Sequence, residues 1–122
     1  MMEIPVNVYT GNPRYVFELI RDSKLSAHRH WEWPVAQGLT VRYAQDKIRM
    51  DASHTQTIQL ILVISTDIAA NVIAGLITAW LLKKFDKEEA KVTKLEIDRD
   101  IVEFDENKIK KIIHEKISKT GQ

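Results

Sequence analysis

The sequence predicts one α+β domain of 122 residues, in which a small mixed or antiparallel sheet packs against a long apolar central helix and two amphipathic helices. Three observations point to this fold class. Some short segments alternate apolar and polar residues as a strand does, others space apolar residues three and four apart as a helix does, and one long run is almost entirely apolar. The expected element order is β-α-β(β)-α-β-β-α.

The chain opens with a strand and a helix. Residues 4–9 alternate apolar and polar positions and are rich in β-branched side chains, which is typical of a strand. Asn12 is a good helix cap and Pro13 suits a first helical turn, so we expect a helix over roughly residues 13–25.

Extended segments follow this helix. We expect residues 27–34 to form a loop or an edge strand, because Pro34 has no N–H for a central ladder. Residues 39–43 alternate again and predict a strand, and residues 47–50 are expected to add a short partner to it.

The C-terminal third predicts a hairpin and a helix. Residues 92–97 and 101–104 flank the turn-forming residues 98–100. Asp105 is placed to cap a closing helix whose polar face is rich in lysine. Its apolar stripe consists of Ile109, Ile112, Ile113 and Ile117.

The dominant feature is the apolar run Thr57–Leu82, 26 residues without a Lys, Arg or Glu. We expect one helix from about His54 to Phe85, capped by Asp51 or Ser53. Its length is also sufficient to cross a bilayer, which needs about 20 apolar residues. The alternative is therefore a small single-span protein of the inner membrane, of the effector or immunity type, with this run as the span.

The middle of the run favours burial in protein over burial in lipid. A charged Asp67 there would cost about 2.5–3.5 kcal/mol on insertion. At helical spacing Asp67, Asn71, Gly75 and Thr78 form one polar or small stripe, which needs polar neighbours. A helix that is apolar on all sides needs a cover, and a second copy of the chain is the simplest one. We expect a homo-oligomer, with Trp80 as a further contact residue.

Composition limits the other partners. The 18 basic and 17 acidic side chains leave a net charge of +1, so no overall field attracts nucleic acid. The absence of cysteine excludes disulfides and thiol catalysis, and the first residues contain no recognisable secretory signal. We expect a cytoplasmic protein that binds no nucleic acid.

Residues 28–33, HRHWEW, have the most unusual local composition. Trp31 and Trp33 are candidates to anchor a loop on the core or at an interface. His28, His30 and Glu32 share one face of an extended segment and are acceptable zinc ligands, but no third imidazole is fixed near them. We therefore favour the aromatic anchors and expect no metal.

No catalytic site is predicted. Ser53, His54 and Asp67 supply the residue types of a catalytic triad, yet a helix start explains Ser53 better. The four glycines are isolated from one another, so there is no phosphate-binding loop and no expected cofactor.

The order of elements, together with the helix ending Ala79-Trp80-Leu81-Leu82 followed by two lysines, resembles the effector-associated constant component family of bacterial conflict systems. The resemblance implies a small non-enzymatic domain, encoded beside effector proteins, that acts by protein contact, and it carries over no catalytic residue. We predict an adaptor that binds another protein or itself, with Trp31, Trp33, Asp67, Asn71, Gly75 and Trp80 as contact candidates.

Overall fold

The protein is described by a computed structural model that covers residues 2–12, 14–16, 32–43, 49–50, 56–65 and 67–120. The strands are β1 (Met2–Thr10), β2 (Glu32–Ala36), β3 (Leu39–Tyr43), β4 (Arg49–Met50), β5 (Gln56–Ile64), β6 (Val92–Ile97) and β7 (Asp100–Glu103). The helices are α2 (Ala70–Phe85), the 3₁₀ helix η1 (Glu88–Ala90) and α3 (Glu106–Thr120), and residues 14–16 are also helical.

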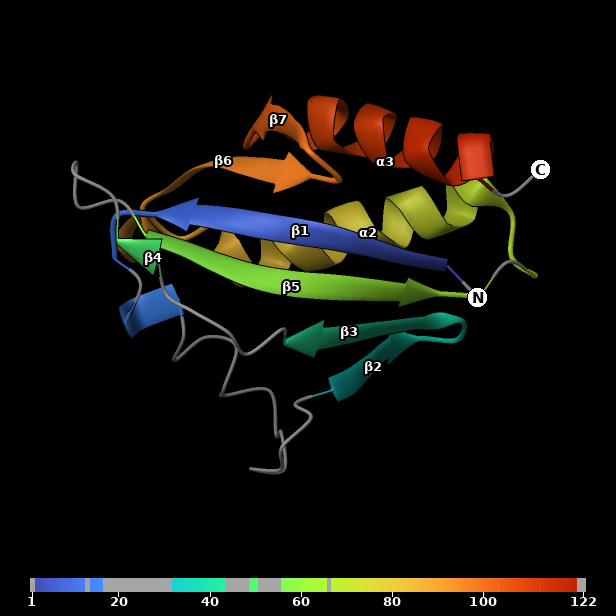
Figure 1. Ribbon diagram of the computed structural model, residues 1–122, viewed down its shortest axis with the longest axis horizontal. Coiled ribbons are helices and arrows are strands. Elements are labelled where there is room, and N and C mark those ends of the chain that lie inside the picture. The colour runs from blue at the N-terminus through green and yellow to red at the C-terminus, as the bar shows by residue number, and fades with distance from the viewer. Residues whose placement is uncertain are drawn as a thin grey trace.

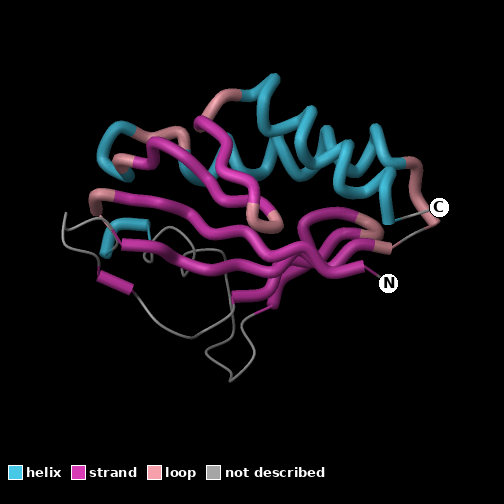
Figure 2. Tube along the Cα trace, turned by 45° about the horizontal axis from the view of Figure 1, so that its top comes forward, coloured by secondary structure: helices cyan, strands magenta, loops and turns pink. Residues whose placement is uncertain are grey.

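The described strands form one antiparallel sheet in the order β2-β3-β5-β1-β6-β7, and β4 pairs with the start of β5. Helices α2 and α3 pack side by side on one face of this sheet and run in opposite directions (Figures 1 and 2). The architecture is therefore α+β, as predicted, with a sheet layer and a helix layer.

The core lies between these two layers. Alternate residues of the two central strands are buried and face the helices, as the twofold period of a strand requires. In the sheet they include Ile4, Val6, Val8, Ile58, Leu60, Leu62 and Ile64. The helices contribute Ile73, Ile77, Leu81, Ile109, Ile113 and Ile117.

Several sequence predictions are confirmed. The opening strand, the strand at residues 39–43 and the C-terminal hairpin are all present. The closing helix begins after Asp105, whose Oδ2 accepts a hydrogen bond from the Lys108 backbone N–H at 3.0 Å. The segment containing Pro34 includes the edge strand β2, at the end of the strand order, so the edge position expected for this proline is correct.

The single long helix over residues 54–85 is wrong. The apolar run is divided into strand β5 and helix α2, with residues 65–69 between them. β5 pairs with β1 along one edge and with β3 along the other, so its backbone N–H and C=O groups form hydrogen bonds on both sides. A strand in the middle of a sheet can therefore be a continuous apolar run. A long apolar run has no polar period, so it does not by itself distinguish a strand from a helix.

This division also removes the single-span interpretation of Thr57–Leu82. Among the described residues no helix is long and apolar enough to span a bilayer. The expected stripe on one helix is corrected too. Asp67 lies before α2, and Thr78 is buried and donates its Oγ1–H to the carbonyl of Ala74 at 2.7 Å.

One smaller prediction is wrong, and others fall partly or wholly outside the described residues. The short segment at residues 49–50 pairs with β5 and not with the strand at residues 39–43. Of the helix predicted over 13–25, residues 14–16 are helical and 17–25 lie outside the described residues. The proposed caps Asp51 and Ser53, and His54, lie outside them as well.

Candidate functional site

Helix α2 carries an apolar face on the side away from the core. Its buried side chains include Ile73, Ile77 and Leu81, whereas Val72 is 49% exposed and Ala79 is exposed. No charged residue occurs in α2 before the exposed Lys83, which lies one turn after Ala79, so the outward face is uncharged up to that turn. We call Val72, Gly75, Ala79 and Leu82 the α2 outer face; Leu76, beside them, is partly buried against the core.

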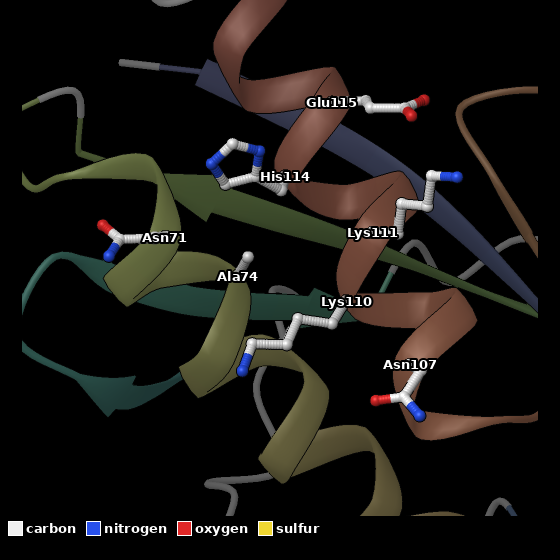
Figure 3. A pocket seen from close by; sticks show the side chains of 7 residues that line it. All are labelled: Asn71, Ala74, Asn107, Lys110, Lys111, His114 and Glu115. Atoms are coloured by element: carbon white, nitrogen blue, oxygen red, sulfur yellow. The ribbon is translucent and has the colours of Figure 1, made fainter.

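A groove of about 380 Å³ lies between α2 and α3, beside this outer face. Its lining residues are Asn71 and Ala74 from α2 and Asn107, Lys110, Lys111, His114 and Glu115 from α3. In Figure 3 Lys110 and His114 extend from α3 toward α2, and Lys111 and Glu115 lie on the other flank of α3. The accessible lining of the groove is mainly apolar, with the cationic and amide groups around it.

Gly75 keeps this part of α2 open. A Cβ at Gly75 would meet no atom within 4 Å, although the residue lies next to the buried Ala74. The helix surface at this point is therefore bare backbone that a partner side chain can approach closely.

The lysines of α3 fall into two groups. Lys108 pairs with Glu103 at 2.6 Å, and Lys116 pairs with Asp100 and Asp98 of the β6–β7 hairpin. The hydrogen bonds that the two ammonium groups donate to Glu103 and Asp100 raise the pKa of both lysines, and the Lys116 ammonium lowers the pKa of Asp100. Lys110 and Lys111, at the groove, form no ion pair within the described part of the chain.

A second hollow, of about 450 Å³, lies between β7 and α3. Ile101, which is 60% exposed, forms part of it. Three of its charged side chains are engaged, because Lys108 pairs with Glu103 and the Lys94 ammonium lies 5.0 Å from the centre of the Tyr9 ring. The other two, Lys111 and Glu115, are shared with the lining of the α2–α3 groove.

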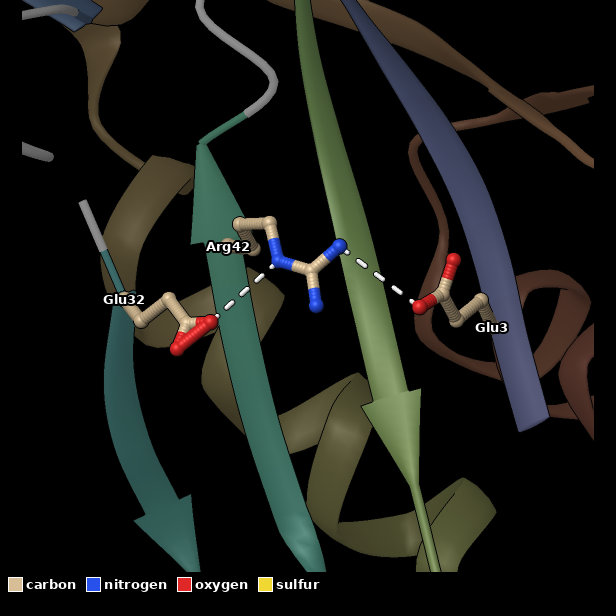
Figure 4. A network of polar contacts seen from close by, with 3 residues as sticks. All are labelled: Glu3, Glu32 and Arg42. Atoms are coloured by element: carbon tan, nitrogen blue, oxygen red, sulfur yellow. Dashed lines mark hydrogen bonds and ion pairs between the residues drawn. The ribbon is translucent and has the colours of Figure 1, made fainter. Parts of the chain in front are cut away.

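The sheet face opposite the helices carries a polar network (Figure 4). Arg42 on β3 reaches Glu32 on β2, with Nε and Oε2 3.3 Å apart, and Glu3 on β1, with Nη1 and Oε2 3.5 Å apart. On the same face the Asn7 amide donates to Oε1 of Glu96 at 2.6 Å. All these groups satisfy one another, which suits a structural role.

The structure places the predicted contact residues in different parts of the molecule. Asn71 lines the groove and Gly75 borders it. Asp67 is exposed in the connection before α2, where its backbone N–H donates to the Ser65 hydroxyl at 3.3 Å. Trp80 packs edge-on against Phe85 with ring centres 5.9 Å apart.

Little can be placed of the HRHWEW segment and its two tryptophans. Trp33 belongs to β2, but its side chain is not among those described, and Trp31, His28 and His30 lie outside the described residues. In the ranges that are described, no three His, Asp or Glu side chains gather as a metal site.

Sequence reasoning did not single out Lys110 or His114. Both lie on the polar face of an amphipathic helix, where a lysine or histidine is ordinarily solvated. Only the packing of α3 beside α2 places them at a groove. The weak signal available was the excess of lysine in the last helix, which has five lysines and two glutamates.

The comparisons with known proteins supply no relative. No protein-family model matches the chain, and neither the curated proteins nor the solved structures gave a match.

Proposed function

We propose that this chain is a non-enzymatic adaptor domain of the cytoplasm that acts by protein contact, through the helix layer. The observation that carries the proposal is the α2 outer face, which exposes Val72 and Ala79 on a helix without charge before residue 83. Exposed apolar surface of this kind is characteristic of binding sites between proteins.

The neighbouring groove supports the same proposal. An apolar helix face beside amide and cationic side chains resembles the centre and the rim of a protein interface. The family resemblance adds a biological setting to the proposal, in which the partner is an effector protein of a bacterial conflict system or a second copy of the chain.

Site-specific photocrosslinking tests this proposal. A crosslinking amino acid in place of Val72 should give one defined protein adduct in cells. The same amino acid in place of Thr93, an exposed residue of β6, should give none. Ala79→Glu in the first variant should abolish the adduct, because it places a charge on the same face.

The size of the adduct distinguishes the two kinds of partner, since a second copy gives twice the mass of the chain. Equal adducts at positions 72 and 93, or an adduct that survives Ala79→Glu, would contradict a specific contact through α2. Circular dichroism of each variant checks that the fold is retained.

A further inference from the structure

We propose that the outer edge of β7 binds an extended segment of a partner protein, which adds a strand to the sheet beside α3. This site is separate from the α2 outer face and does not depend on it. β7 lies at the margin of the sheet next to α3 (Figure 1), and in the described part of the chain no strand pairs with its outer edge. The backbone groups at this edge define what can bind there.

The β6–β7 hairpin determines which backbone groups of β7 point outward. Across its two-residue turn, Asp100 and Val102 direct their N–H and C=O groups to β6. The Phe104 N–H continues this alternation, because it donates to the β6 backbone at 3.1 Å. The N–H and C=O groups of Ile101 and Glu103 therefore point to the outer edge.

Most of these outward groups are unpaired. The Glu103 carbonyl accepts a hydrogen bond from the Asp105 N–H at 2.8 Å. The Ile101 N–H and C=O and the Glu103 N–H form no hydrogen bond among the residues that the structure describes. A row of unpaired donors and acceptors along a strand is a template for the backbone of another strand.

The opposite edge of the sheet, β2, is less suited to this pairing. Pro34 lies within β2 and has no N–H, and the register of β2 with β3 shifts between Pro34 and Ala36. A proline and a bulge are features by which proteins protect an edge strand. β7 has neither, and its register with β6 is unbroken. Of the two edges, β7 is therefore the one open to an added strand.

The hollow of about 450 Å³ between β7 and α3 gives such a strand apolar contact. Val102, opposite the buried Leu95, faces the helix layer and lines the hollow together with Ile112 of α3. Ile101 faces the other side of the sheet and is 60% exposed. An added strand would place alternate side chains against Val102 and Ile112, and the side chain between them beside Ile101.

The charges around the edge do not favour a charged occupant. Asp100 pairs with Lys116, and Glu103 pairs with Lys108. The remaining charged residues of the hollow that face it from α3 are Lys111 and Glu115, which have opposite signs. The expected occupant is therefore a short extended run of apolar β-branched residues, which suit both the backbone edge and the apolar lining.

A second copy fits this edge less well, because its β7 would bring its own α3. The ion pairs Lys108–Glu103 and Lys116–Asp100 attach α3 to both ends of β7. Two antiparallel β7 strands paired through their outward groups would have both helix layers on the same side of the sheet. Neighbouring strands lie about 4.8 Å apart, whereas packed helices need about 8–10 Å. The second α3 would compete with the first for the space at the hollow.

A synthetic peptide of about seven residues tests the proposal, since this is an ordinary strand length. Its centre is valine, isoleucine and valine, with a threonine and a lysine on each side, so it reads the same in both directions. The Ile101 amide of the free full-length chain should exchange its hydrogen faster than the Val102 amide, which is bonded to β6. Adding the peptide should slow exchange at Ile101 by at least about tenfold, as measured by NMR.

A methylated form of the peptide is the matched control. Methyl groups on the three central backbone nitrogens keep every side chain and remove the N–H groups that pair with an edge. This peptide should bind at least about tenfold more weakly in an NMR titration, because main-chain hydrogen bonds supply the affinity of an added strand.

Variants of the chain locate the site. Ile101→Pro removes an N–H that points outward and leaves the bonds of β7 to β6 in place, so it should weaken peptide binding at least about tenfold. Ile101→Val keeps the N–H and a β-branched side chain and should bind as the wild type does. The NMR spectrum of each variant checks the fold, and the methylated peptide tests the same hydrogen bonds without any change to the protein.

Several outcomes would overturn the proposal. These are an Ile101 amide that the peptide does not protect, equal binding of the methylated peptide, and binding that survives Ile101→Pro in a folded variant. Protection confined to the amides of β2 would move the site to the wrong edge. A wild-type dimer in sedimentation velocity that Ile101→Pro dissociates would assign the edge to a second copy. The crosslinked adduct at position 72 is a separate measurement and tests only the α2 outer face.

Discussion

Arg42 and Glu3 are joined across a strand that separates them, since β5 lies between β3 and β1 in the sheet. The guanidinium crosses over β5, where the register places Ile61 opposite Arg42 on one side and opposite Pro5 on the other. The ion pair therefore connects two strands that share no backbone hydrogen bonds.

A double-mutant cycle on this pair should give a small coupling energy. Arg42→Met keeps the aliphatic stem, and Glu3→Gln keeps the shape while removing the charge. The two side chains are 31% and 53% exposed, so we expect a coupling of about 0.2–1 kcal/mol in the free energy of unfolding by urea. A coupling well above that range would show that the network contributes more than a surface ion pair.

The Thr10 hydroxyl should contribute more to the free energy of unfolding than the Arg42–Glu3 ion pair does, because this hydroxyl is buried. Its Oγ1–H donates to the Ala90 carbonyl at 2.5 Å, and the same oxygen accepts from the Asn12 N–H at 2.9 Å. Thr10→Val keeps the volume and leaves both backbone groups without this partner, so the free energy of unfolding should fall by about 1–3 kcal/mol. Thr93→Val, at an exposed position, is the matched control, and equal effects would refute the explanation.

Two glycines should respond to alanine with opposite signs. Gly38 has φ +83°, and a Cβ there would overlap the Ile68 side chain, so Gly38→Ala should lower stability by more than about 1 kcal/mol. Gly75 lies within α2 with free space around it, so Gly75→Ala should raise stability by about 0.5–1 kcal/mol. Thermal unfolding of the two variants beside the wild type measures both, and effects of the same sign would contradict the prediction.

The hydrogen bond from Lys116 holds the pKa of Asp100 below its ordinary value. Lys116→Met should raise the pKa of Asp100 toward that value, as followed by NMR titration of the side-chain carboxyl. Lys119→Met should raise it less, because Lys119 acts only through its more distant charge. An unchanged pKa in Lys116→Met would show that the contact does not persist in solution.

The lowered pKa of Asp100 also determines how the stability of the fold depends on pH. Because the pKa of Asp100 is lower in the folded state, the ionised carboxylate favours folding. This contribution is present above the ordinary pKa of an aspartate and is lost as the pH falls through the folded pKa. The wild type should therefore lose more stability than Lys116→Met in the acid range.

Sequence reasoning succeeded where one face of an element is polar. β1 and α3 alternate or space their apolar residues clearly, and the burial of Val6 and Ile113 follows directly from that period. The same reasoning selected Asn71 and Gly75, which stand out as polar or small positions in an apolar helix. It did not select Lys110, because nothing local separates a lysine at a groove from one in open solvent.

The sequence by itself determined the α+β class, the closing helix and its cap at Asp105, because capping and periodicity act within a few residues. Only the tertiary structure decided that the run Thr57–Leu82 divides into β5 and α2, and that α3 lies beside α2 to form a groove. The physical reason is that an apolar segment takes its conformation from the partners available to its backbone and side chains. For β5 those partners are β1 and β3, which are distant from each other in the sequence.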